Sequence, residues 1–295
     1  MLKHLNAAPQ RPRRVVVVGA SGFVGGAVAG WLEQAGIETV RVGRKETDLL
    51  APDGAQKLAA MLSQGDALVA ASAMAPVKNA AMLRDNMTIA LAIATAAADV
   101  KLSHVVNIGS DALYSDSDKP LTEDSVTAPD NLHGIMHAAR EVMFRNTIQA
   151  PLAFVRPTLI YGACDPHNGY GPNRFRRLAA EGKTITLFGN GEERRDHVYI
   201  GDVAELVYQV LLHRSVGAIN AVSGAVTSFR DIAEKVVALS GNSVAIEPTP
   251  RSAAMPHNGY RAFDPAAIHA AFPEFRITPL DEGLAQAHAE AQAGA

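Results

Sequence analysis

Two histidines four residues apart stand in the segment His133-Gly134-Ile135-Met136-His137. On a helix, this spacing places both side chains on one face, one turn apart. An imidazole titrates at about pH 6.5, so it can exchange protons at neutral pH without help from a neighbouring charge. The spacing also suits metal ligation, but the glutamate that follows the first histidine in zinc-protease helices is absent. The pair therefore predicts proton exchange or hydrogen bonding by imidazole rings, and no metal site.

A glycine-rich segment directly after the apolar run Val15–Val18 has the composition of a phosphate-binding turn. Glycine permits a tight turn and lets backbone N–H groups approach a pyrophosphate, and the N-terminus of a following helix adds partial positive charge. The segment predicts a dinucleotide site, with a merely structural turn as the alternative. Its expected cofactor contacts are Gly19, Ser21, Gly22, Phe23, Val24 and Gly25.

The residues after the second apolar run, Thr39–Val42, indicate which dinucleotide binds. A carboxylate for the adenosine ribose is expected there, but the chain continues with Gly43, Arg44 and Lys45. Arg44 can make a forked, charge-assisted contact with a 2′-phosphate, which favours NADP(H) over NAD(H). Arg44 as a plain surface charge is the alternative. Asp48 is expected either to contact the adenine or to cap a helix.

Apolar runs alternate with helical patterns along the first half of the chain. Such alternation predicts an α/β fold with a Rossmann-type, doubly wound parallel sheet. The apolar runs lack polar alternation, as in strands that are buried on both faces. The expected strands are Val15–Gly19, Thr39–Val42, Ala67–Ser72, His104–Gly109 and Leu152–Arg156. The expected helices are Val24–Gln34, Ala55–Leu62, Ala80–Ala98 and Leu132–Thr147.

Composition limits the classes of partner. The 295 residues carry a net charge of −3 without a long basic stripe, so we expect no nucleic acid and no anionic membrane surface. The uncharged run Val15–Leu32 is interrupted by glycines and is not expected to span a membrane. The basic segment before it lacks the features of a signal peptide and is expected to be a solvated arm in a cytoplasmic protein. The single cysteine, Cys164, is expected to be a packing residue.

Several motifs together resemble the extended short-chain dehydrogenase/reductases, the NAD(P)-dependent sugar-nucleotide epimerase/dehydratase family. The resemblance covers nearly the whole chain and is most specific in its later part. The motifs are the glycine turn of the GxxGxxG type, Asn86 before the helix Met87–Ala98, the loop Ile108–Tyr114, the segment Arg156–Gly162, and the run Leu187–Ala204.

The resemblance implies a role for residues in each motif. It makes Ser110, four residues before Tyr114, catalytic, and it places Arg195 against the diphosphate of a nucleotide-linked substrate. The other expected cofactor contacts are Ala71, Ala73, Asn86, His137 and Pro157. The other expected substrate contacts are Asp111, Asn173 and Arg251, with Arg261 as a further possible phosphate contact.

The same resemblance implies a division into two parts. We place a dinucleotide-binding domain at residues 12–164, with residues 203–225 returning to it. A smaller C-terminal substrate lobe is expected at residues 165–202 and 226–295.

The family's acid/base is a tyrosine, and a lysine one turn later lowers the tyrosine's pKa and holds the nicotinamide ribose. The family's glutamate, eight residues after the tyrosine, is matched by Glu141, which puts His133 at the tyrosine position and His137 at the lysine position. We expect Ser110 to orient a sugar hydroxyl or carbonyl, His133 to exchange its proton and His137 to bond the ribose. Two alternatives stay open: a cofactor-binding sensor or scaffold without redox turnover, and a non-redox isomerase or lyase with His133 as its base.

The helices Ala80–Ala98 and Leu132–Thr147 stand where members of this family commonly dimerise. The first is nearly all small and apolar, more so than a surface helix normally is. A homodimer is therefore expected, and burial within the same chain is the alternative explanation. The expected small-molecule partner is a nucleotide sugar.

Overall fold

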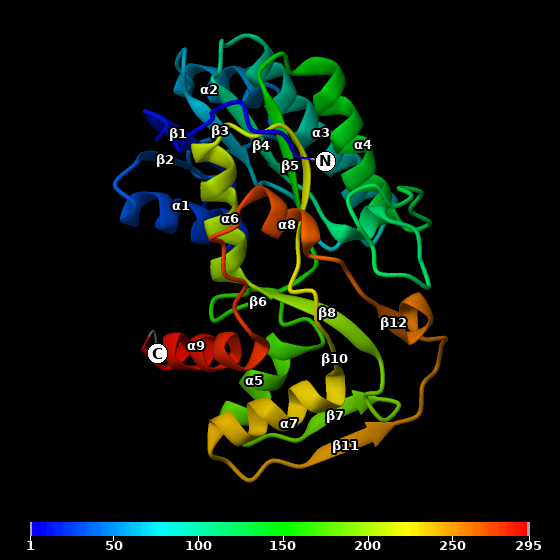
Figure 1. Cartoon of the computed structure of the whole chain (residues 1–295). Helices are drawn as coiled ribbons and strands as arrows, with labels where there is room; N and C mark the ends of the chain where they lie inside the picture. Colours follow the sequence, from blue (N-terminus) through cyan, green and yellow to red (C-terminus); the bar gives the residue numbers. More distant parts are fainter. Residues whose placement is uncertain (1, 294–295) are drawn as a thin grey trace.

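The computed structural model describes residues 2–293, and its larger part is built on a six-stranded parallel sheet (Figure 1). Each pair of neighbouring strands runs parallel. In spatial order the strands are β2 (Glu38–Val42), β1 (Arg14–Val18), β3 (Ala67–Ala70), β4 (His104–Ile108), β5 (Leu152–Pro157) and β9 (Gly217–Ala221). The strands expected from the sequence are confirmed, with ends shifted by one or two residues.

The order of strands reverses between β1 and β3. From β1 the chain crosses through α1 (Phe23–Gln34) to β2 on one side, whereas β3 pairs with the other side of β1. In open parallel sheets, ligands bind at such a switch point, outside the carboxyl ends of the strands. The glycine turn after β1 and the residues after β3 therefore meet where a ligand is expected.

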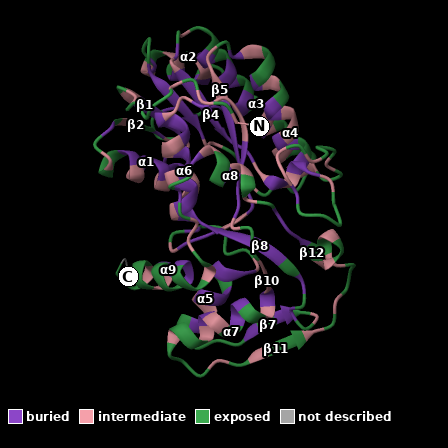
Figure 2. Cartoon of the chain, in the orientation of Figure 1, coloured by how far each residue is buried: buried purple, intermediate pink, exposed green. Residues whose placement is uncertain are grey.

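Successive residues of β1 alternate between the two faces of the sheet. Val15 and Val17 belong to one core cluster, and Val16 and Val18 to another. The first face is covered by α1, α6 (Ile200–Leu212) and α8 (Ala266–Ala271). The second face is covered by α2 (Gly54–Met61), α3 (Ala80–Ala98) and α4 (Leu132–Thr147). Figure 2 shows the buried strands between these layers, which confirms the doubly wound architecture and, to within one residue, the expected helices.

A smaller lobe with its own core lies below the sheet in Figure 1. Its β8 pairs with β6, β10 and β12, while β7 pairs with β11. The lobe contains β6 (Leu159–Tyr161), α5 (Pro172–Ala180), β7 (Ile185–Phe188), β8 (Arg194–Tyr199), β10 (Val226–Ser228), α7 (Phe229–Ser240), β11 (Ile246–Thr249), β12 (Tyr260–Arg261) and α9 (Leu280–Ala293). Two short 3-10 helices, η1 (Asp111–Leu113) and η2 (Pro256–Gly259), lie in connecting loops. Helix α8 packs with the first core cluster of the sheet.

The structure corrects the expectation of a solvated N-terminal arm. The backbone of Lys3 exchanges two hydrogen bonds with Val216, at 2.9 and 2.8 Å. The ring of His4 bonds the Ser215 hydroxyl at 2.8 Å and the Ala271 carbonyl oxygen at 2.9 Å. The arm is thus anchored by backbone pairing, which its basic composition did not indicate.

Two further findings concern exposure. Cys164 is a free, exposed cysteine, so the expectation that it packs in the interior is wrong. No helix within residues 2–293 combines the length and the apolar character needed to cross a bilayer.

Candidate functional site

The glycine turn packs directly against the chain after β3. Gly19 has a φ of +92°, and a Cβ there would lie 2.6 Å from the Ser72 backbone nitrogen. A Cβ on Gly25 would lie 2.2 Å from the Gly19 carbonyl oxygen. No described side chain caps α1 at Gly22, so the helix N-terminus remains available to an anion. A cradle that only glycine can form is what close approach of a pyrophosphate requires.

A cleft of about 360 Å³ opens at this switch point. The loop after β2 and the chain after β3 form its walls. Seven of the expected cofactor residues line it: Gly19, Ser21, Gly22, Arg44, Asp48, Ala71 and Ala73.

The remaining expected cofactor residues lie outside that lining. Phe23 begins α1, with Val24 and Gly25 in the same turn, and Pro157 ends β5. The side-chain amide of Asn86 is used within the chain, since it accepts from Met74 N at 2.8 Å and donates to the Met74 carbonyl oxygen at 3.0 Å. Asn86 therefore fixes the chain after β3.

An acid that was not expected from the sequence, Glu46, lies close to Arg44 at the end of β2. The Glu46 carboxylate accepts a hydrogen bond from Gly43 N at 2.7 Å and lies near Ser21. It thereby reaches the end of β2, where a ribose-binding acid is expected, although it stands three residues further along the chain. Arg44 is exposed and makes no ion pair with residues 2–293, while Asp48 caps its own turn through Leu50 N at 3.0 Å.

The two histidines lie on the first turns of α4. Asn131 caps this helix by accepting from Gly134 N at 2.9 Å. The rings of His133 and His137 contact edge to face, with centroids 4.8 Å apart, and the Nδ1 atom of each is buried without a partner among the described residues. Burial lowers the pKa of His133, although nearby Asp111 opposes this. Burial, and then the charges of His133 and Arg140, lower the pKa of His137 well below its usual value, so both rings are neutral at neutral pH.

The serine loop packs against the start of α4. A Cβ on Gly134 would lie 2.1 Å from the Ala112 carbonyl oxygen, so glycine allows this close approach. Ser110 caps η1 by accepting from Ala112 N at 3.1 Å, and its hydroxyl also contacts the Asp111 carboxylate at 3.4 Å. The structure thus packs the loop that carries Ser110 against the first turn of α4, which carries His133, and their joint role in catalysis stays a prediction.

Asp111 is bound from the substrate lobe. Its carboxylate accepts a hydrogen bond from Arg261 Nε at 2.9 Å, and Arg261 also donates to the Asp111 carbonyl oxygen at 2.7 Å. Another nitrogen of Arg261 pairs with Asp116 at 3.0 Å, and His257 bonds the same carboxylate. Arg261 is therefore not available for the phosphate contact considered for it, because it already ties the serine loop to β12.

Arg195 and Arg251 converge on one acid. Arg195 Nη1 lies 3.2 Å from the Glu193 carboxylate, and Arg251 Nη2 lies 3.7 Å from it. Arg251 Nε also contacts Glu192, at 3.5 Å. The Nε of Arg195, and Nε and Nη2 of Arg251, have no hydrogen-bond partner among the described residues. The two guanidinium groups therefore keep hydrogen-bond donors that no described residue uses, and a diphosphate could accept hydrogen bonds from them.

The sequence of this chain matches the NAD dependent epimerase/dehydratase family over residues 15–222. The chain belongs to that family. This membership covers the sheet domain, the serine loop, the histidine helix and the strand that carries Arg195.

Part of the chain is also similar to a curated protein. The chain is 28% identical over 158 residues to the low-salt glycan biosynthesis protein Agl12 of Haloferax volcanii, a match that covers 50% of this chain and 49% of that protein. The chain thus spans about half the length of this curated relative.

Solved structures show the same fold. The UDP-glucose 4-epimerase of Thermus thermophilus, in complex with NAD, superposes with a TM-score of 0.84 at 20% identity, covering 96% of this chain and 100% of that one. The GDP-L-fucose synthetase of Naegleria fowleri, bound to NADP, superposes with a TM-score of 0.82 at 16% identity, covering 99% and 97% of the two chains.

In this epimerase/dehydratase-family chain, Asn173 is used internally. Its amide oxygen accepts from Gly162 N at 3.0 Å, and its amide nitrogen donates to Asp165 at 2.9 Å. It therefore holds the loop between β6 and α5, and its contact with substrate stays a prediction.

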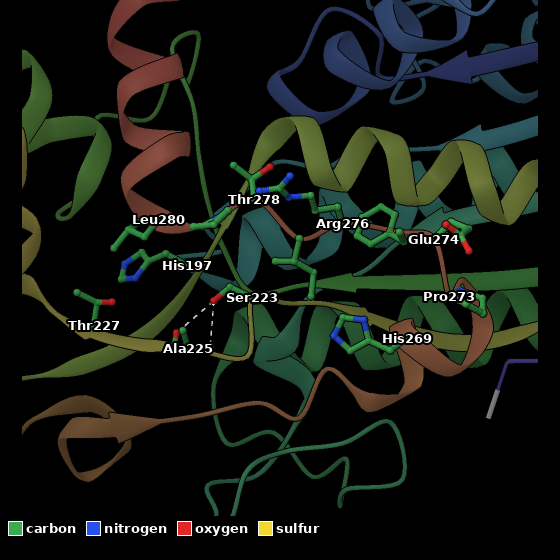
Figure 3. A pocket seen from close by; sticks show the side chains of 13 residues that line it. His197, Ser223, Ala225, Thr227, His269, Pro273, Glu274, Arg276, Thr278 and Leu280 are labelled. Carbon is green, nitrogen blue, oxygen red and sulfur yellow. Dashed lines mark hydrogen bonds between the residues drawn. The ribbon is translucent and has the colours of Figure 1, made fainter.

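A larger cavity, of about 540 Å³, is lined by a different set of residues (Figure 3). It is bordered by residues 273–280, which connect α8 to α9, and by the chain around Ser223. Of the run that resembles the family's motif, His197 reaches this cavity. None of the expected catalytic, cofactor or substrate residues lines this cavity. We therefore do not assign the candidate active site to it, although it is larger than the cleft at the switch point.

Within residues 2–293, no group of three or more histidine, cysteine, aspartate or glutamate side chains is arranged to hold a metal ion.

Two further candidate residues were not expected from the sequence, although the sequence contains a pattern that points to each of them. Arg140 follows His137 by three positions and His133 by seven, so helical periodicity puts it in the same row. Phe188 is 51% exposed at the end of β7, inside the run that resembles the family's motif. An aromatic side chain in such a motif signals a stacking surface.

Proposed function

We propose that this protein is an NAD(P)-dependent epimerase or oxidoreductase acting on a nucleotide-linked sugar, with His133 as its acid/base. The observation that carries the proposal is a neutral, half-buried imidazole on the first turn of a helix that packs against the Ser110 loop. Family membership supports the cofactor class, and the relatives that act on UDP- or GDP-linked sugars support the substrate class.

The residues divide the chemistry between them. Ser110 orients the reacting hydroxyl, and the imidazole of His133 accepts its proton when the sugar is oxidised and returns it when the sugar is reduced. When bound, the nicotinamide supplies the hydride acceptor and donor. His137 bonds the ribose as a neutral ring. No lysine is required, because an imidazole is already deprotonated at neutral pH.

The nucleotide half of the substrate is proposed to lie on the lobe. Arg195 and Arg251 bind the diphosphate through the guanidinium groups that converge on Glu193. The exposed ring of Phe188 offers a face for the base, since nucleobases stack on aromatic side chains. We predict that Arg251→Met weakens binding of a nucleoside diphosphate about tenfold or more by calorimetry.

Hydride exchange tests the reaction. Deuterium should pass between labelled NAD(P)H and a UDP- or GDP-hexose, and His133→Ala should slow this exchange by about 10²-fold or more. His288→Ala, which changes a histidine on α9, is the matched control. Full activity in His133→Ala would overturn the assignment. Cofactor binding without exchange would favour the sensor or scaffold, and loss of water without cofactor oxidation would favour the lyase.

The choice between NADP(H) and NAD(H) is proposed to depend on Arg44 and Glu46. Arg44 favours NADP(H), whereas the Glu46 carboxylate at the end of β2 repels a 2′-phosphate. We predict that Arg44→Ala weakens NADPH about tenfold and leaves NADH unchanged, and that Glu46→Gln strengthens NADPH. Tighter binding of NADH by the unaltered protein would contradict the preference for NADP(H).

A homodimer through α3 and α4 is also proposed. Most of the apolar residues of α3 are buried within this chain, which accounts for its composition without a partner. Leu91 on α3 and Val142 on α4, however, are each 55% exposed. Sedimentation of the unaltered protein and of Leu91→Glu tests this: a monomer in both cases would contradict the dimer.

A further inference from the structure

Arg140 on α4 is a buried cation without an acid partner. It is 1% exposed, and it is the largest of the fully buried side chains within residues 2–293. Its Nη1 donates to the Ser72 carbonyl oxygen at 2.6 Å, and its Nη2 donates to the Ala70 carbonyl oxygen at 3.0 Å. Its Nε has no partner, and the guanidinium lies 5.2 Å from the ring centroid of Phe144. Residues 2–293 place no carboxylate in an ion pair with it.

One of these carbonyl groups belongs to a residue of the cleft wall, and the other belongs to the strand that leads into the wall. Ala70 ends β3, and Ser72 lines the cleft directly opposite Gly19, whose Cβ would fall 2.6 Å from Ser72 N. The side chain of Arg140 therefore joins the histidine helix to the wall on which the glycine turn rests. One residue fixes the spacing of three parts of the site.

The burial of this charge needs an explanation. A cation removed from water without a counter-charge costs free energy, and proteins retain such groups mainly at functional positions. Burial lowers the pKa of Arg140 to about 10, which still leaves it charged at neutral pH. Phe144, one turn later on the same helix, shows that an apolar side chain fits this environment.

We propose that Arg140 is a positioning residue of this site: it holds the chain after β3 against the helix that carries the two histidines, and it places a fixed positive charge beside His137. The inference rests on the proposed function for the identity of the cofactor. It adds to that function a residue that acts through His137 and the cleft wall, without touching the substrate.

Among the charged groups near the two histidines within residues 2–293, Arg140 is the one without an acid partner. Its charge is among the causes that lower the pKa of His137, after burial and the nearby His133. The other charged groups around the histidines are already paired: Asp111 with Arg261, and Glu141 with Arg156 and Arg145. Arg140 is thus the cation that no acid balances, and it favours the uncharged form of the adjacent imidazole.

Three variants separate the hydrogen bonds from the charge. Arg140→Met removes both the charge and the two hydrogen bonds to the chain after β3. Arg140→Lys keeps the charge but cannot make both hydrogen bonds. Arg145→Met is the control, because it changes a half-exposed arginine of the same helix. The readouts are the dissociation constants of NADH and NADPH by calorimetry, the titration of the His137 ring by NMR, and the thermal unfolding midpoint. The His137 signal is assigned from its loss in His137→Gln.

We expect Arg140→Met to weaken binding of the dinucleotide about tenfold and to raise the pKa of His137, without lowering the unfolding midpoint. Arg140→Lys should restore the pKa of His137 but not the affinity, and Arg145→Met should change neither. An unchanged affinity and an unchanged His137 titration in Arg140→Met would overturn the inference.

Two further outcomes also test the proposal. If Arg140→Met does not fold, Arg140→Lys carries the test, and full cofactor affinity in that variant would overturn the positioning role of the hydrogen bonds. If the unaltered protein binds neither dinucleotide, the proposed function fails, while the titration of His137 still tests the charge.

Discussion

Helix α4 carries two neighbouring groups of buried polar side chains that differ in their pairing. In the first, Glu141 accepts two hydrogen bonds from Arg156, at 2.8 and 2.7 Å, and Arg156 donates to the Tyr114 hydroxyl at 2.7 Å. In the second, the Nδ1 of His137 and the Nε of Arg140 have no partner among the described residues. The first group contains an ion pair that offsets the hydration it loses, whereas the cation of the second group bonds two carbonyl oxygens and, within residues 2–293, no acid.

The two buried arginines show the same difference in their protonation. Burial acts to lower the pKa of Arg156, but its hydrogen bonds and charge attraction to Glu141 and Tyr114 raise it overall. Arg140 has burial alone, and its pKa falls to about 10. We therefore expect the paired group to contribute to the stability of the fold, and the group without an acid to contribute to the proposed site.

The largest expected effect comes from breaking the paired group. Glu141→Gln leaves Arg156 buried without a counter-charge, so we expect the free energy of unfolding to fall by about 3–5 kcal/mol in chemical denaturation. Glu33→Gln is the control, because Glu33 pairs with Arg41 at 2.7 Å on the surface and should cost less than about 1 kcal/mol. Equal costs for the two variants would show that the buried pair contributes no more to stability than a surface pair.

His104, on β4 and outside the site, shows what burial alone does to an imidazole. Its Nε2 bonds the Ser215 carbonyl oxygen at 2.7 Å, and burial lowers its pKa to about 4. The unfolded state then binds the proton more readily, at about pH 6.5, so stability is present above that pH and is lost as the pH falls towards 4.

The contribution of His104 amounts to roughly 3 kcal/mol between pH 7 and pH 4. We expect His104→Gln to flatten the dependence of the unfolding free energy on pH in that window. If the slope stays the same, other histidines, such as His133 and His137, cause most of the loss of stability at acidic pH.

A neutral member of the paired group should have a smaller effect. The Tyr114 hydroxyl donates to Asn220 at 2.7 Å and accepts from Arg156. Tyr114→Phe leaves both partners without that contact, and we expect a loss of about 1–3 kcal/mol in the unfolding free energy. Tyr208→Phe is the control, since the Tyr208 hydroxyl makes no hydrogen bond with residues 2–293. A loss no greater than in that control would mean that the network contributes little to stability.

Much of the fold follows from local patterns in the sequence. Uninterrupted apolar runs can be buried only between two layers, so the strands and their doubly wound arrangement were predictable. The positive φ of Gly19 and its contact with Ser72 agree with what the glycine motif indicated. The pairing of Lys3 with Val216 was not predictable, because it joins segments over 200 residues apart through backbone atoms that carry no sequence signal.

The site was predictable in its motif residues and not in its long-range contacts. The cleft collects Gly19, Arg44 and Ala71, as expected. By contrast, the bonds of Arg261 to Asp111 cross 150 positions, and those of Arg140 to Ala70 cross 70. A charged residue in the sequence does not disclose whether its partner is an acid, a carbonyl group or solvent, and that difference separates the two groups on α4.

The smallest effect on stability is expected for His133, and it tests the comparison most closely. Because the Nδ1 of His133 is buried without a partner, His133→Asn removes no hydrogen bond, and the unfolding free energy at pH 7 should change by less than about 1 kcal/mol. Below about pH 6.5 the variant should be more stable than the unaltered protein, since burial lowers the pKa of His133 and its protonation opposes folding. A loss at pH 7 as large as that of Tyr114→Phe would mean that His133 is paired after all, through a contact such as an ordered water. The two groups on α4 would then differ in function but not in energetics.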